Sequence, residues 1–144
     1  MIIAEIPYKS PSIADDQTKR ALHELIARTL DAMSTPGSDA SSYFSNPDIA
    51  VAGSGMDEFV FGPEEVRGLA ELVSSWAMRW EPKMVVCWRR GDIAWAQIRI
   101  GVRKVENGAE VVVNYVATGV FALEQDAWSW LYWGGGEPQM QARV

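Results

Sequence analysis

Residues 46–68, which read NPDIAVAGSGMDEFVFGPEEVRG, set the order of secondary structure in the middle of this chain. Residues 49–52 are an apolar run of strand length, and the Gly-Ser-Gly turn at 53–55 precedes β-favouring residues 59–61. Pro63 then suits the first position of a helix, and two glutamates follow where a helix N-terminus favours negative charge. The stretch therefore predicts a strand hairpin leading directly into a helix.

Apolar spacing predicts three helices. Residues 13–34 carry apolar side chains at intervals of three and four, with Ser12 as a plausible N-cap. A short helix is expected at residues 39–44. The third helix is expected at residues 63–80, with an apolar stripe that ends in two tryptophans, before Pro82 stops it.

Three or four strands are predicted after the third helix, at residues 83–90, 93–104, 110–123 and 127–133. Short turn signals separate them, namely Gly91-Asp92, Asn107-Gly108 and Gln125-Asp126, so the sheet should be an antiparallel meander. A two-residue turn after the third of these strands would place Gly119 opposite Tyr132, with Tyr115 and Tyr132 on one face. Along the second of these strands, alternation places Ala94, Ala96, Ile98, Ile100 and Val102 on one wholly apolar face. Both faces of this sheet would be largely apolar, and helices can cover only one of them. We therefore expect a homodimer through the outer sheet face.

The composition limits the partners. The chain has 144 residues, of which 48% are hydrophobic and 22% charged, as in an ordinary single globular domain. Its net charge of −6 and the lack of a basic run argue against nucleic acid and anionic membranes as partners. Cys87 is the only cysteine, which excludes an internal disulfide and a cysteine-rich metal site. No apolar run reaches the length of a membrane span, and no signal peptide is recognised, so a cytoplasmic location is expected.

Several short motifs resemble one family. They occur at residues 46–48, 53–59, 62–67, 91–95, 117–121 and 128–130. Their order resembles the SnoaL-like branch of the nuclear transport factor 2-like superfamily, which also includes ketosteroid-isomerase-like proteins. The resemblance implies an α+β, cone-shaped fold in which three helices pack on the concave face of a strongly curved antiparallel sheet. It also implies frequent homodimers and a pocket between sheet and helices.

The resemblance predicts a single SnoaL-like domain at residues 12–138, an N-terminal arm at 1–11 and a C-terminal tail at 139–144. Many relatives carry histidines near the end of the last strand. Here Tyr132 and Gly134 occupy the matching stretch. This departure weighs against acid–base chemistry that depends on histidine. The single histidine, His23, is better explained as a structural residue, and no metal site or cofactor is expected.

Two carboxylates at the hairpin are candidate catalytic groups. Asp57 or Glu58 would act as a general base if its side chain pointed into the pocket, with a tyrosine phenol stabilising the oxyanion. The competing interpretation is a solvated hairpin tip.

Aromatic residues are the candidate pocket walls. Those expected to contact a ligand are Tyr43, Trp76, Trp80, Tyr115, Trp130 and Tyr132. The same side chains would also suit a core or a subunit interface. Three functions stay open at this point: binding of a small hydrophobic molecule, an isomerase- or cyclase-type enzyme, and a non-catalytic association module.

Overall fold

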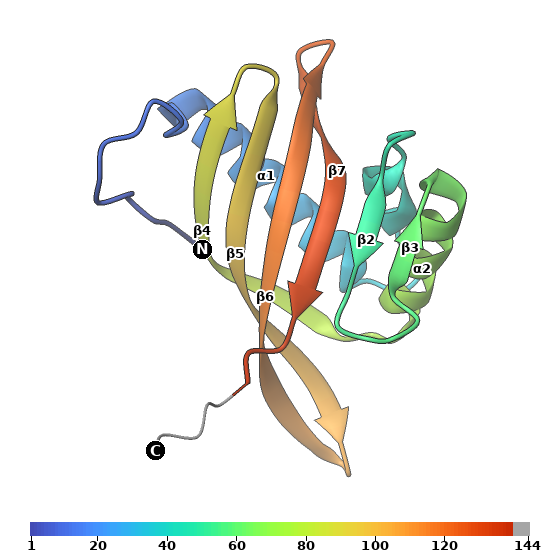
Figure 1. The fold of residues 1–144 in the computed structure, drawn as a ribbon. Coiled ribbons are helices and arrows are strands. Elements are labelled where there is room, and N and C mark those ends of the chain that lie inside the picture. Colours follow the sequence, from blue (N-terminus) through green and yellow to red (C-terminus); the bar gives the residue numbers. More distant parts are fainter. Residues whose placement is uncertain (140–144) are drawn as a thin grey trace.

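The computed structural model describes residues 1–139 and shows an α+β domain built on one open, mostly antiparallel sheet (Figure 1). The sheet has seven strands in the order β1-β4-β5-β6-β7-β2-β3. The strands are β1 (Ile2–Ile3), β2 (Ala50–Ala52), β3 (Phe59–Phe61), β4 (Arg79–Arg90), β5 (Ile93–Glu106), β6 (Ala109–Glu124) and β7 (Ala127–Gly136). The hairpin of β2 and β3 joins β7 through a parallel pairing of β2 with β7.

Two α-helices and one 3-10 helix cover the sheet, so the expectation of three helices is corrected. The α-helices are α1 (Asp16–Met33) and α2 (Pro63–Ser75), and the short helix at Ala40–Phe44 (η1) is of the 3-10 type. Helix α1 crosses behind the long strands, and α2 lies beside the β2–β3 hairpin (Figure 1). The N-cap of α1 is Asp15, whose carboxylate accepts a hydrogen bond from the backbone N–H of Thr18 at 2.7 Å, and not Ser12.

Helix α2 ends five residues earlier than its apolar stripe predicts. Trp76 is its C-cap, and Ala77 has a left-handed φ of 57°, which turns the chain out of the helix. Strand β4 begins two residues later, and Trp80 pairs with Val102 of β5. Trp80 is therefore a strand residue. Its backbone pairs with β5 and does not form a further turn of helix α2.

The predicted meander of β4 to β7 is confirmed, but β7 contains a bulge that sequence alternation does not reveal. Phe121 pairs with Trp130, whereas the preceding residue Val120 pairs with Tyr132. Leu131 is the extra residue between these pairs, and it reverses the alternation of the side chains that follow. As a result Gly119 pairs with Trp133, and its expected pairing with Tyr132 is wrong.

The core lies between α1 and the inner sheet face. The apolar face predicted for the second long strand is confirmed, since its members are buried. They are Ala94, Ala96, Ile98, Ile100 and Val102. Trp130 is fully buried and donates a hydrogen bond from Nε1 to Thr29 Oγ1 of α1 at 2.9 Å. Thr29 in turn donates to the carbonyl oxygen of Leu25 at 2.7 Å, so helix and sheet are joined by satisfied polar groups within an apolar core.

The first residues form an edge of the sheet. Ile2 and Ile3 of β1 pair in parallel with β4, and the Ala4 N–H donates to the Val85 carbonyl oxygen at 2.9 Å. Of the predicted C-terminal tail, residues 140–144 lie outside the described residues. Within residues 1–139, no helix is long and apolar enough to cross a membrane.

Candidate functional site

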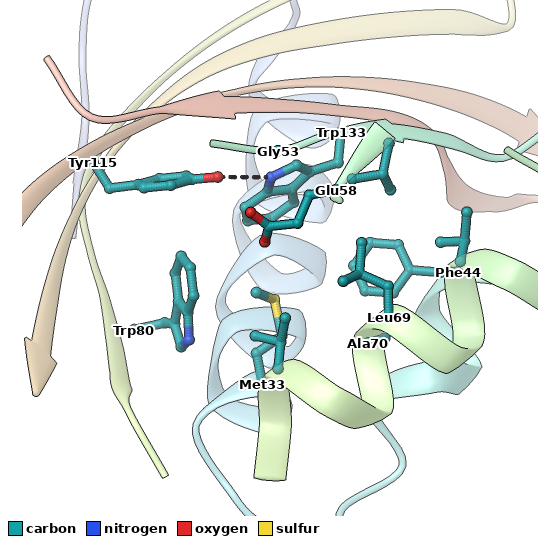
Figure 2. Close-up of a pocket in the computed structure, with 12 residues that line it drawn as sticks. Met33, Phe44, Gly53, Glu58, Leu69, Ala70, Trp80, Tyr115 and Trp133 are labelled. Atoms are coloured by element: carbon teal, nitrogen blue, oxygen red, sulfur yellow. Dashed lines mark hydrogen bonds between the residues drawn. The ribbon is translucent and has the colours of Figure 1, made fainter. Parts of the chain in front are cut away.

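A cavity between the helices and the inner sheet face is the candidate site (Figure 2). Its inner part has a volume of about 40 Å³ and its outer part a volume of about 220 Å³. Both parts share three wall residues, Glu58, Trp80 and Tyr115. The other inner walls are almost wholly apolar and come mainly from the helices and β7. They include Met33, Phe44, Val66, Leu69, Ala70, Val73 and Trp133.

Tyr115 of β6 places a phenol at the sheet side of the cavity. Its hydroxyl accepts a hydrogen bond from Trp133 Nε1 at 3.3 Å, which leaves the phenolic proton available for donation (Figure 2). Burial raises the pKa of Tyr115 above its ordinary value; the hydrogen bond from Trp133 lowers this pKa, and the Glu58 carboxylate raises it. The net shift is upward, so the group is a neutral hydrogen-bond donor at physiological pH.

Glu58 is the last residue of the hairpin loop before β3. Its carboxylate accepts a hydrogen bond from the Gly55 N–H, and its backbone carbonyl accepts one from the Gly53 N–H at 2.7 Å. A Cβ atom at Gly53 would lie 2.8 Å from the Glu58 Cβ, so the glycine leaves space for this side chain. Figure 2 shows the carboxylate directed into the cavity below the Tyr115–Trp133 hydrogen bond.

The second hairpin carboxylate, Asp57, is exposed at the loop and does not line the inner or outer cavity. The two carboxylates that sequence reasoning treated together are thus placed in different environments. Of this pair, Glu58 is the one with access to a molecule in the cavity.

Trp80 forms another wall. Its indole ring lies edge-on to Tyr115, with ring centroids 5.2 Å apart at an interplanar angle of 84°. Its backbone N–H donates to Ser34 Oγ at 2.8 Å, which links the start of β4 to the end of α1. Trp80 is 8% exposed, and its Nε1 atom is buried without a hydrogen-bond acceptor in the described part of the chain.

The other aromatic residues predicted as ligand contacts are not brought together. Trp76 is 47% exposed and lines only the outer part. Trp130 lies in the core, Tyr43 is half-buried against that core, and neither lines the cavity. Tyr132 lies on the opposite sheet face because of the bulge in β7. Ligand contact by any of the predicted residues stays a prediction.

Trp133 is a wall residue that the sequence interpretation did not assign to the pocket. Simple alternation from Trp130 places it on the outer face, and the bulge at Leu131 reverses this placement. Phe44 of η1 is also a wall residue, and its ring lies 6.4 Å from that of Trp133. The sequence shows that η1 ends in two aromatic residues, but the packing of Phe44 against β7 depends on the tertiary fold.

Other reactive groups do not converge on the cavity. His23 lies half-buried on α1 outside the cavity walls. Burial raises the pKa of the Cys87 thiol to about 11, so little thiolate is present at neutral pH. Among residues 1–139, no group of three or more His, Cys, Asp or Glu side chains could hold a metal ion.

The chain is thus an α+β protein in which an antiparallel sheet and the helices that cover it enclose a pocket. The model of the SnoaL-like domain family matches residues 22–135, most of the chain. The chain therefore belongs to the SnoaL-like domain family. No curated protein matches it.

Solved structures share the fold at low sequence identity. A candidate dehydratase of the NTF2-like family from Streptomyces avermitilis is 17% identical, with a TM-score of 0.77 over 88% of this chain and 100% of that chain. An NTF2-like protein from Novosphingobium aromaticivorans is 15% identical, with a TM-score of 0.73 over 88% of this chain and 85% of that chain. A candidate ketosteroid isomerase from Shewanella frigidimarina is 12% identical, with a TM-score of 0.66 over 81% of this chain and 94% of that chain.

Proposed function

We propose that the cavity binds a small, largely apolar molecule. The observation that supports this most directly is the combination of apolar helix side chains with a phenol and a carboxylate along one wall. Apolar walls favour a ligand through the area that they remove from water, and a few polar groups orient it. The inner part, about 40 Å³, has room for only a few non-hydrogen atoms, so a ligand would extend from it into the outer part of about 220 Å³.

Filling the inner cavity should abolish this binding. Ala70 lines the inner cavity from α2, so Ala70→Leu would place three further carbon atoms among its walls. We expect α-methylstyrene, followed by nuclear magnetic resonance titration, to bind the wild type and to bind Ala70→Leu at least about tenfold more weakly.

Glu71→Leu is the matched control, because it adds a leucine at the next, exposed position of the same helix. Its affinity for α-methylstyrene should equal that of the wild type. Equal affinity of Ala70→Leu and the wild type would contradict binding in this cavity. Native mass spectrometry of the freshly purified protein would reveal the mass of any small molecule that co-purifies with it.

An isomerase- or cyclase-type enzyme is the second candidate, and one observation favours it. Glu58 and the neutral phenol of Tyr115 line the same cavity, as a general base and an oxyanion donor would. The descriptions of two similar structures as a candidate dehydratase and a candidate isomerase are consistent with such chemistry. Glu58→Gln would separate the two functions, because loss of turnover with retained α-methylstyrene binding would indicate a catalytic carboxylate.

A homodimer through the outer sheet face is part of the same proposal. The support is a row of large side chains that crosses this face: Trp88 and Trp95 stack with centroids 6.3 Å apart, and Val120 and Tyr132 continue the row. A contiguous apolar face of this kind suits a second copy of the chain, since a two-fold interface is self-complementary.

A further inference from the structure

The outer part of the cavity combines aromatic walls with carboxylates. Its aromatic wall residues are Trp76, Trp80 and Tyr115. The rings of Trp80 and Tyr115 meet at 84° with their centroids 5.2 Å apart, so they form a corner, and the Trp76 side chain is about half exposed. Glu58 and Glu137 line the same part. Its volume of about 220 Å³ is many times that which one water molecule needs, so a substituted head group has room there.

No basic side chain neutralises these two carboxylates. Within residues 1–139 the ion pairs involve other acidic residues, and neither Glu58 nor Glu137 takes part in one. Lys104 also lines the outer part, but its ammonium group is paired with Glu106 at 2.9 Å. The hydrogen bond with Glu106 raises the pKa of Lys104, and the charge of Glu137 contributes less to this shift. Lys104 is therefore compensated by Glu106, and the outer part keeps a net negative charge.

Glu58 has one carboxylate oxygen that a ligand can reach. Its Oε2 accepts the hydrogen bond from the Gly55 N–H, whereas its Oε1 accepts none within residues 1–139. In the same part of the chain, Trp80 Nε1 is the one buried side-chain nitrogen or oxygen without a partner, so Glu58 Oε1 retains accessible surface. Figure 2 shows the carboxylate directed toward the space beside Tyr115 and Trp80. A ligand in this space would contact the carboxylate and the aromatic rings together.

The combination restricts the charge of the ligand. Carboxylates repel an anion, which would also lose its hydration among the apolar walls. A cation is attracted both by carboxylates and by the negative faces of Trp and Tyr rings. Burial raises the pKa of Tyr115 most, and Glu58 and Glu137 raise it further, so the field of both carboxylates reaches this wall. A methylated ammonium suits the site, because its methyl groups pack against rings while its charge faces the carboxylates.

We propose that the ligand of this cavity is an organic cation whose methylated ammonium head lies in the outer part, between Glu58 and the rings of Trp80 and Tyr115. Its short apolar body then extends into the inner part among the side chains of the helices. This inference rests on the proposed function and narrows it from apolar molecules in general to tertiary amines and quaternary ammonium compounds. Glu58 determines the selectivity for charge, and Trp76 adds a third ring at the exposed end of the site.

Two probes of the same shape test the proposal. Phenyltrimethylammonium and tert-butylbenzene share one framework and differ in a charged nitrogen against a neutral carbon. Titrations at physiological ionic strength are followed by nuclear magnetic resonance of protein labelled with ¹⁵N-tryptophan, in which the Trp76 indole signal is assigned from its loss in Trp76→Leu. We expect the wild type to bind phenyltrimethylammonium at least about tenfold more tightly than tert-butylbenzene, with a shift of the Trp76 signal.

Variants test the source of the selectivity. Glu58→Gln removes the charge but keeps an acceptor for the Gly55 N–H, and it should weaken phenyltrimethylammonium binding about tenfold while tert-butylbenzene binding stays unchanged. Asp57→Asn is the matched control, because it removes one negative charge at the preceding residue, which does not line the cavity. Its affinities should stay within about twofold of the wild type, since salt screens exposed charges. Trp76→Leu should weaken phenyltrimethylammonium binding about threefold.

The outcomes distinguish this inference from the function on which it rests. Equal affinity of the two probes for the wild type would overturn the cation proposal, and this comparison needs no variant. A preference that persists in Glu58→Gln would also overturn it, as would equal weakening in Asp57→Asn and Glu58→Gln, since the overall charge of −6 would then attract the cation. Binding of α-methylstyrene without binding of phenyltrimethylammonium would overturn this inference alone. Failure of all three compounds to bind would overturn the proposed function together with it.

Discussion

The position of the Tyr115 phenol depends on the absence of a side chain at Gly135. A Cβ atom built on Gly135 would lie 1.9 Å from the Tyr115 hydroxyl oxygen, far inside any van der Waals contact. Gly135 pairs with Ala117 across the β6–β7 ladder, so the backbone has little freedom to move away. This glycine is explained by close approach of a neighbouring side chain and not by a turn.

Gly135→Ala should therefore displace Tyr115 and break its hydrogen bond with Trp133. We expect a loss of about 1–3 kcal/mol in the free energy of unfolding, measured by urea denaturation, because overpacking forces side chains from their preferred positions. Gly136→Ala is the control at the next residue, where an added Cβ meets nothing within 4 Å. Equal stability of the two variants would contradict the tight fit at Gly135.

At the scale of elements, the contact of α1 with β7 determines which tryptophans reach the cavity. Trp130 is anchored by Thr29 in the last third of helix α1, and the bulge at Leu131 then turns Trp133 to the same inner face. The rings of Trp130 and Trp133 lie 5.2 Å apart. A strand that alternated regularly would place only one of them inside.

Thr29→Val tests the anchor between helix and sheet. Valine has nearly the same shape as threonine but offers no acceptor, so Trp130 Nε1 would be buried unpaired. We expect the free energy of unfolding to fall by about 1–3 kcal/mol in urea denaturation. Thr35→Val is the control, because the Thr35 hydroxyl is exposed and water can replace its bond to the Asp31 carbonyl oxygen. A Thr29→Val protein as stable as this control would rule out the anchoring role.

At the scale of the whole molecule, the two faces of the sheet differ in what covers them. Helices α1 and α2 cover the inner face, and within residues 1–139 no helix covers the outer one (Figure 1). The outer face carries a depression of about 400 Å³ between Met84, Val86 and Val116, with Arg99 in its wall. Val116 is 42% exposed near the centre of this face.

The proposed homodimer predicts a mass of twice the 16.0 kDa chain in light scattering after gel filtration. Val116→Arg should yield the monomer, because two copies would bring like charges together in an apolar contact. Val105→Arg makes the same change at a position that is 73% exposed near the β5–β6 turn, and it should leave the dimer intact. A monomeric wild type would mean that the outer face serves another partner or none.

Much of the fold follows from local sequence signals. The reversal after β6 was predicted from Gln125 and Asp126, which have positive φ values of 52° and 65°, and the hairpin before α2 was predicted from its glycines. Period-two patterning identified the buried face of β5. These predictions succeed because turn chemistry and side-chain alternation act over a few residues.

The site could be predicted only in part. Glu58, Trp80 and Tyr115 were among the candidates and do line the cavity, but Asp57, Trp130 and Tyr132 could not be separated from them. Local sequence determined that this chain has a helix-covered antiparallel meander rich in buried aromatics. Tertiary structure alone decided which aromatics meet, because the start of β4 at Trp80 and the extra residue at Leu131 depend on pairing with strands distant in sequence. Such pairing energies are not present in any single stretch of the chain.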